Sequence, residues 1–126
     1  FEKNFEKYKG QNNALFIEKN CWSIDITNIG KFNIYMYDGN HDESSHFKAL
    51  NYYYPCLDDI FIYIVDDWNV PHIQKGTLNS IQKNNLTILF KKEIFNTVTE
   101  WNVPGGFGKD GDWHNGISIF VLQKTT

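Results

Sequence analysis

The feature that most constrains the fold is an apolar run that stops at two adjacent carboxylates. Residues 60–65 read IFIYIV, a stretch of β-branched and aromatic side chains without a charge. A short continuous run of this kind is typical of a strand that is buried on both faces of a sheet. Asp66 and Asp67 follow at once, and Trp68 comes next. A fold that buries this strand therefore brings two like charges to one end of it.

Predicted helices and further predicted strands lie on either side of this strand in the sequence. Apolar residues spaced by three and four predict helices before Gly10, at 43–57 and from Pro71 to 83. The residues that would face the core in the last two are Phe47, Leu50, Tyr54 and Leu57, and then Ile73, Thr77, Leu78 and Ile81. Short apolar runs predict strands at 14–20, 32–41 (where the strand ends on Asp38-Gly39), 60–66, 86–94 and 116–124, and a long surface loop at 96–116.

The alternation of strands with helices predicts an α/β fold with a mostly parallel sheet and helices on both faces. No helix separates the last two strands, so we expect the final strand to be antiparallel. The 126 residues amount to one domain or less. The first residues, FEKNFEKYKG, are typical of the latter part of a helix. We therefore expect residues 1–126 to be a single partial domain.

The composition limits the classes of partner that we expect the chain to bind. The net charge is −3, all twelve basic residues are lysines, and arginine is missing, which argues against nucleic-acid binding through arginine forks. Two cysteines are too few for a disulfide framework. No apolar run approaches the roughly 18 residues that span a membrane, and no signal peptide is present. We expect a cytoplasmic protein that binds neither nucleic acid nor membrane.

Three carboxylates are predicted to converge. Parallel strands present their carboxyl ends at the same edge of a sheet, and ligands of open α/β sheets bind there. Asp38 ends the strand that begins at residue 32, and Asp66 and Asp67 end the next. Mg²⁺ or a similar divalent cation would neutralise such a cluster through oxygen ligands. The alternative is that these acids only cap helices or form turns.

The segments YMYDGNH, FIYIVDDWN and NGISIFVLQK resemble the C-terminal half of class I S-adenosylmethionine-dependent methyltransferases. The greatest similarity is to metal-dependent O-methyltransferases of the macrocin and sugar type. That family has a seven-stranded Rossmann-like sheet with an antiparallel last strand. Its fourth strand ends on Asp-Gly and its fifth on Asp-Asp or Asp-Asn, which matches Asp38-Gly39 and Asp66-Asp67.

The resemblance implies roles for individual residues. They are Asp38, Asp66 and Asp67 as metal ligands, Asn40 and His41 beside the transferred methyl group with His41 as general base, Asn20, Cys21, Trp22 and Asp38 as cofactor contacts, and Trp68, Trp113 and His114 as walls of the acceptor pocket. The acceptor would be a sugar or another small hydroxylated molecule. The alternative for the tryptophans and for Cys21 is that they are packing residues. The histidines lack ligand-type spacing, so a histidine metal site is not expected.

The chain departs from the family at its beginning. The glycine-rich cofactor loop and the acidic residue that holds the ribose are missing, so we expect this chain to be inactive alone. Without the preceding strands, residues 32–38 would form an exposed apolar edge. We expect either residues 14–18 to pair with that edge or two copies of the chain to associate across it.

Two other functions stay open. The chain would be a non-catalytic binding or assembly module if it kept half of a nucleotide-type fold without chemistry. A glycosyltransferase-like enzyme that holds a sugar nucleotide through a metal ranks last, because no Asp-x-Asp stands in a suitable loop.

Overall fold

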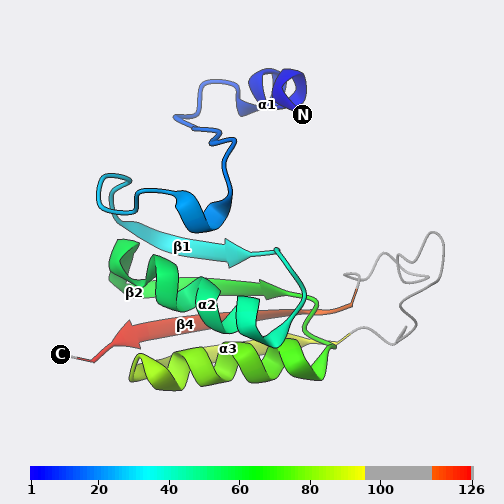
Figure 1. The fold of residues 1–126 in the computed structure, drawn as a ribbon, viewed down its shortest axis with the longest axis vertical. Helices are drawn as coiled ribbons and strands as arrows, with labels where there is room; N and C mark the ends of the chain where they lie inside the picture. Colours follow the sequence, from blue (N-terminus) through cyan, green and yellow to red (C-terminus); the bar gives the residue numbers. More distant parts are fainter. Residues whose placement is uncertain (96–114, 126) are drawn as a thin grey trace.

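A computed structural model describes residues 1–95 and 115–125 of the chain. Their centre is a four-stranded sheet with the order β1-β2-β4-β3 (Figure 1). The strands are β1 (Phe32–Tyr37), β2 (Leu57–Asp66), β3 (Leu86–Ile94) and β4 (Ile117–Lys124). The predicted α/β class is confirmed, and four of the five predicted strands form.

The sheet is mixed. β1 and β2 are parallel, whereas β4 pairs antiparallel with both β2 and β3. The prediction of an antiparallel last strand is therefore confirmed. Because β4 lies between β2 and β3, only one of the three pairings is parallel, although β1, β2 and β3 all run in the same direction.

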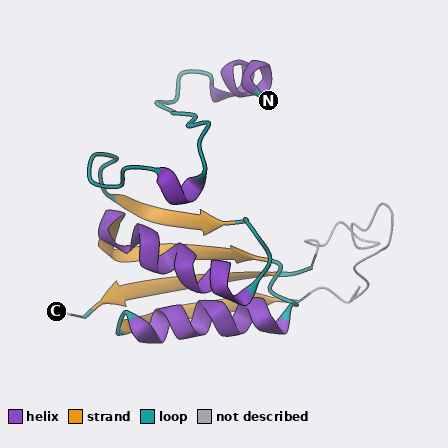
Figure 2. Cartoon of the chain, in the orientation of Figure 1, coloured by secondary structure: helices purple, strands orange, loops and turns teal. Residues whose placement is uncertain are grey.

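Three α-helices accompany the sheet, and local residues explain where they begin and end. They are α1 (Glu2–Lys9), α2 (Glu43–Tyr53) and α3 (Pro71–Lys83), and two short 3₁₀ turns, η1 and η2, cover Cys21–Ser23 and Tyr54–Cys56 (Figure 2). The Asp42 side chain accepts a hydrogen bond from the backbone N–H of Ser45 at 2.7 Å and so caps α2. Pro71 starts α3 at the position where its missing N–H costs nothing.

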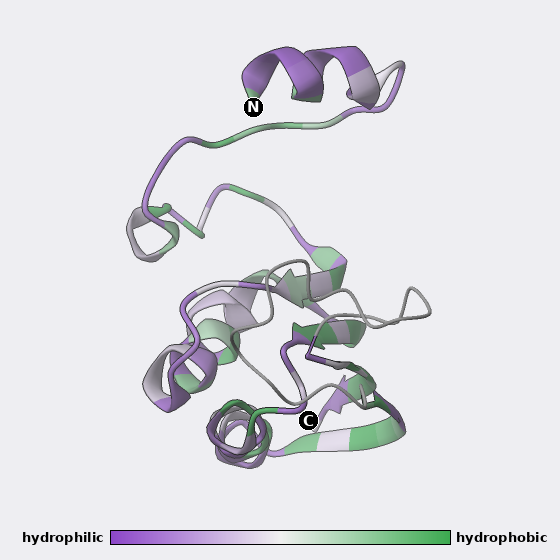
Figure 3. Cartoon of the chain, turned by 90° about the vertical axis from the view of Figure 1, so that its right-hand side faces the viewer, coloured by the Kyte–Doolittle hydropathy of each residue, from purple (hydrophilic) through white to green (hydrophobic). Residues whose placement is uncertain are grey.

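Both long helices lie on the same face of the sheet (Figures 1 and 3). The core between these layers contains Phe61, Tyr63 and Val65 of β2, Phe120 and Leu122 of β4, Ala49 and Leu50 of α2, and Ile73 and Ile81 of α3. Alternate residues of each strand point into this core, as the twofold period of a strand requires. The prediction of helices on both faces is not confirmed among the described residues.

The opposite face of the sheet is apolar and exposed. Its side chains alternate with those of the core along β2, whereas β3 is exposed along most of its length and has an irregular register between Ile88 and Phe90. Phe32, Ile34, Met36, Ile60, Phe90 and Ile94 are the large members of this open face. Single exposed apolar residues are ordinary, but a contiguous set across several strands marks an interaction surface.

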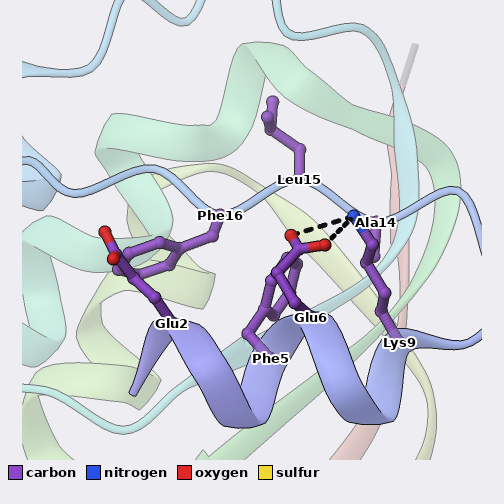
Figure 4. A pocket seen from close by; sticks show the side chains of 7 residues that line it. All are labelled: Glu2, Phe5, Glu6, Lys9, Ala14, Leu15 and Phe16. Atoms are coloured by element: carbon purple, nitrogen blue, oxygen red, sulfur yellow. Dashed lines mark hydrogen bonds and ion pairs between the residues drawn. The ribbon is translucent and has the colours of Figure 1, made fainter.

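The N-terminal segment differs from its prediction. Residues 14–20 form no strand, and Phe16 instead packs against Phe1 and Phe5, with ring centroids 4.7 Å and 5.9 Å away. Figure 4 shows Phe16 beside Phe5 of α1. A hollow of about 350 Å³ lies between α1 and residues 14–16. The expectation that residues 14–18 pair with the β1 edge is therefore wrong, and β1 is a terminal strand of the described sheet.

Smaller corrections concern boundaries. The second predicted helix ends at Tyr53, and β2 begins at Leu57, three residues earlier than expected. Leu78 points outward with 38 % exposure, although its spacing in α3 suggested the core. None of the described helices has the length and apolar character needed to cross a lipid bilayer.

Candidate functional site

The site lies at the edge where β1 and β2 both end. Tyr37 and Val65 are paired in the parallel register, so the residues that follow them emerge side by side. Asp38 follows β1, while Asp66 and Asp67 come at the end of β2. Asp67 adopts a left-handed backbone conformation with φ of 54°, which aspartate tolerates better than most residues. This turn directs its side chain inward, and the side chain is only 6 % exposed.

Two of the three predicted metal ligands, Asp38 and Asp67, form one group with His41, whereas Asp66 contacts Asp38 through a side-chain hydrogen bond and is not a member of that group. His41 Nε2 lies 2.9 Å from an Asp67 carboxylate oxygen and 4.0 Å from one of Asp38. One potential ligand atom from each of these three residues lies within 4.8 Å of the other two. The group combines a buried carboxylate with two side chains that are about half exposed, so a molecule from solvent can reach it.

The cluster is electrostatically strained. The pKa of Asp38 is raised, first by partial burial, next by the charge of Asp66 and a hydrogen bond with it, and then by Asp67. His41 acts in the opposite direction. Like charges held together in this way favour either a shared proton or a bound cation. The negative charge at this end of the strands thus comes from Asp38, Asp66 and Asp67 together and not from one of them.

A tight turn carries the histidine. A Cβ added at Gly39 would lie 2.6 Å from the end of the Tyr37 ring, so any larger residue here would have to displace that ring. The Asn40 amide donates to Asp42, and this leaves the predicted catalytic Asn40 engaged in the turn. Hydrogen bonds from Ser44 and Ser45 hold the pKa of Asp42 down to about 2. The turn is therefore ordered by its own side chains.

The predicted cofactor segment lies against α2, beyond Tyr37. Asn20 accepts a hydrogen bond from the backbone of Trp22 at 2.9 Å and caps η1. The Trp22 ring is half-buried, 6.1 Å from the Tyr37 ring, and Lys48 Nζ lies 4.5 Å from its centroid. Cys21 is exposed. The structure thus places the Trp22 ring beside Tyr37, the residue that precedes Asp38.

Trp68 is a core residue and not the wall of a pocket. Its side chain has no exposed area, its indole N–H donates to Glu93 at 2.7 Å, and its ring meets Phe120 edge to face. The prediction that it lines an acceptor site is corrected by this burial. The other two predicted acceptor residues, Trp113 and His114, lie outside the described residues.

The sequence-based interpretation underestimated His41. We predicted a base and excluded a histidine from the ligand group, because the four histidines lack regular spacing. The available signal was the closeness of His41 to Asp38 in the chain, three residues apart in the loop that follows β1. Chemically, two carboxylates and an imidazole can bind a divalent cation, accept protons and orient a hydroxyl group.

Comparison with known proteins adds no assignment: no protein-family profile matches the chain, and no curated protein sequence matches it.

Proposed function

We propose that this chain forms the metal-binding half of an S-adenosylmethionine-dependent O-methyltransferase that acts on a sugar or another small hydroxylated substrate. The observation that carries the proposal is the convergence of Asp38, Asp66 and Asp67 with His41 at the ends of adjacent parallel strands. Ligand sites of open α/β sheets lie at this edge. The antiparallel last strand agrees with the sequence resemblance to that family.

The donor set fits a divalent cation. Carboxylate oxygens are preferred by Mg²⁺ and Mn²⁺, and an imidazole beside them is compatible with Mn²⁺. The buried Asp67 carboxylate would be the fixed ligand, and the more exposed Asp38 would complete the set. When bound, the cation would supply Lewis-acid polarisation of a substrate hydroxyl group.

His41 would handle the proton. S-adenosylmethionine carries an electrophilic methyl group, and the acceptor hydroxyl must lose its proton as the new O–C bond forms. The His41 side chain is 43 % exposed, so it faces solvent as well as Asp67, and histidine exchanges protons near neutral pH. Asp67 would orient the imidazole for this step.

The cofactor itself fits less well. The Asn20 side chain is used in its own turn, and the Trp22 ring is packed among aromatic residues, so the described residues offer few donors for an adenine or ribose. The cofactor assignment depends on the sequence resemblance alone. We therefore propose that this chain does not transfer methyl groups by itself.

A metal titration tests the proposal. We expect calorimetry to detect binding of MnCl₂ or MgCl₂ by the wild-type chain and to lose it with Asp67→Asn. Asp59→Asn is the matched control, because it removes the same charge at the opposite end of β2. Metal at one hundred times its dissociation constant should raise the free energy of unfolding by about 2.7 kcal/mol. A wild-type chain that binds neither cation would refute the metal site.

The methyltransferase assignment needs its own test. A longer polypeptide that joins this chain to a glycine-rich cofactor-binding half should transfer labelled methyl groups to hydroxylated acceptors in a metal-dependent reaction. The chain alone should not bind S-adenosylmethionine firmly. Metal binding without any methyl transfer by the joined protein would leave a cation-binding domain of another class.

The second candidate is a non-catalytic assembly module, and the open face favours it. β1 is a terminal strand of the described sheet, and an apolar hollow of about 240 Å³ lies beside Ile34 and Met36. Two copies would extend the sheet by pairing through this strand. Light scattering that shows a homo-oligomer, together with melting that is insensitive to metal, would favour this candidate over the enzyme.

A further inference from the structure

The open face of the sheet, on the side away from α2 and α3, contains two complete rows of paired side chains (Figure 3). Directly paired residues of neighbouring strands point to the same side of a sheet. The first row crosses all four strands as Ile34, Ile62, Val121 and Phe90. The second row crosses them as Met36, Ile64, Ile119 and Lys92. The two rows form a continuous strip that is apolar except at Lys92.

The charge of Lys92 lies at the border of this strip. Lys92 belongs to β3, which is a terminal strand of the described sheet. A lysine at such a border lays its apolar stem on neighbouring side chains and keeps its ammonium group in water. The members of both rows on β2 and β4 are isoleucine and valine only. The middle of the strip therefore offers a partner apolar contact and no charge.

The two borders of the first row differ in shape. At the β3 border the Phe90 side chain is 53 % exposed. At the β1 border an apolar hollow of about 240 Å³ lies beside Ile34. The strand order separates the two borders by β2 and β4, and three strand spacings amount to roughly 14 Å. Phe90 therefore cannot fill the hollow of its own chain.

The exposed apolar area approaches what a stable dimer needs. The six large side chains of the open face are 42–57 % exposed. Side chains of this size have about 150–250 Å² to bury, so these six offer roughly 450–700 Å². The partly exposed members of the rows on β2 and β4 add to this area. A standard interface buries about 800 Å² on each partner, and homodimer interfaces are more apolar than others.

We propose that the open face is the interface of a homodimer, in which a second copy of the chain stacks its own open face on this one. An apolar face is its own complement, as a twofold interface requires. Sheets that pack face to face lie about 10 Å apart, and their side chains interdigitate. A twofold axis along the strands places β1 of each copy over β3 of the other. Each Phe90 then enters the hollow beside Ile34 of the partner subunit.

This arrangement differs from pairing through the free edge of β1. Edge pairing joins backbone groups of β1 and gives no role to Phe90, which is three strands away. Stacking uses side chains of all four strands. Asp38 and Asp66 lie beyond the second row, at the ends of their strands, so the interface does not depend on the proposed metal site.

Sedimentation equilibrium of the full chain over a wide range of concentrations tests the interface. The wild type should form a reversible dimer. Phe90→Lys should raise the dissociation constant of the dimer at least about a hundredfold, because each copy then brings an unpaired ammonium group into the dry contact. Leu78→Lys is the matched control, because it adds the same charge at an exposed leucine on the outer side of α3. Its dissociation constant should stay within about twofold of wild type.

Oxidation of Met36 by hydrogen peroxide gives a second readout that needs no variant. Met36 is the only methionine of the chain and belongs to the second row. Mass spectrometry should show that Met36 of the wild type is oxidised more slowly in concentrated samples than after dilution. In Phe90→Lys the rate should be high at both concentrations, although residue 90 is three strands from Met36.

Three results would each overturn the proposal. They are a wild type that stays monomeric at every concentration, equal Met36 oxidation rates before and after dilution, and a folded Phe90→Lys chain that dimerises as the wild type does. The last result would leave pairing through the β1 edge as the mode of association. The metal titration and the methyl-transfer assay are separate measurements, so their failure would remove the proposed function and leave this interface standing.

Discussion

Strand β2 carries the same pair of residues near both of its ends, and the two pairs meet opposite surroundings. Asp58 and Asp59 lie near the ammonium group of Lys124, whose pKa is lowered chiefly by burial while these two carboxylates act to raise it. Asp66 and Asp67 meet a third carboxylate, Asp38, whose pKa is raised. The electrostatic environment of each Asp-Asp pair in β2 thus depends on the strand that ends beside it and not on the pair's own sequence.

The difference follows from the topology. Parallel β1 and β2 place two acidic ends together, whereas antiparallel β4 brings its last residue, Lys124, to the opposite end of β2. Lys124 also donates to the carbonyls of Tyr54 and Leu57, where η2 passes into the strand. One end of β2 therefore has a cation beside its carboxylates, and at the other end three carboxylates meet, with His41 2.9 Å from Asp67.

The largest expected effect comes from the residue that anchors the acidic edge. Trp68→Ala should lower the free energy of unfolding by about 3–5 kcal/mol, because it removes a fully buried ring and leaves Glu93 without its indole donor. Urea unfolding measures the change, and Leu89→Ala on the exposed side of β3 should cost far less. A Trp68 that lined a ligand pocket would instead weaken binding with little loss of stability.

The next effect concerns His46, whose burial should lower the free energy of unfolding at low pH. His46 is buried, both of its ring nitrogens lack a hydrogen-bond partner, and its pKa is lowered to about 4, mainly by burial and then by the charge of His41. The unfolded chain therefore takes up the proton first, near the ordinary value of 6.5. The free energy of unfolding should fall by at most about 3 kcal/mol as the pH drops from that value to about 4.

Urea unfolding at a series of pH values checks this contribution. His46→Gln should make the dependence shallower between these two pH values, because residue 46 no longer titrates there. An identical slope in wild type and variant would show that His46 is not responsible.

Gly76→Ala should have a smaller effect on the same edge. The new methyl group would press on the Glu43 carbonyl and cost about 1–3 kcal/mol, because a backbone contact cannot yield as a side chain can. Asn79→Ala, on the exposed side of α3, is the control and should stay within about 0.5 kcal/mol of wild type. A neutral Gly76→Ala would mean that α2 can move away from α3.

The smallest effects on the free energy of unfolding should have opposite signs at the two ends of β2. The raised pKa of Asp38 means that its ionised form weakens the folded state above that pKa, and the penalty disappears as the pH falls through it. Asp38→Asn should therefore stabilise the metal-free chain slightly at pH 7 and not at pH 3. Asp59→Asn should destabilise it slightly, because it removes a charge that favours protonated Lys124.

This pair of variants is tested by measuring the free energy of unfolding of chelator-treated samples at low and at high salt. Both changes should shrink at high salt, since exposed charges are screened. Changes of the same sign in the free energy of unfolding at both ends of β2 would contradict the proposed difference between them.

The fold was predictable where a local rule and a tertiary partner agreed. Pro71 marked the start of α3, and the apolar run of β2 indicated a central strand. Residues 14–20 have strand-like composition but no pairing partner in the described sheet, so propensity alone misled there. Leu78 satisfied the spacing of a core position but lies on the outer side of α3.

The candidate site was predictable as a meeting of carboxylates and not in its details. The parallel arrangement of β1 and β2 requires Asp38 and Asp66 to emerge together, and this could be inferred from the order of elements. The approach of His41 to Asp67 depends on a left-handed residue and a glycine packed under a tyrosine ring, which have no periodic signal. The contact of His72 with the His41 carbonyl depends on how α3 packs against α2, which no local pattern encodes.

The position of β4 between β2 and β3 has a consequence for synthesis on the ribosome. In the described sheet β3 pairs only with β4, and β2 lacks a neighbour on one side until β4 arrives. The nascent chain can form the β1-β2 pair early, but β3 must wait for the segment translated after it. A truncation that removes Ile117–Lys124 would thus leave β3, made some thirty residues earlier, without its pairing strand and would expose the centre of the sheet.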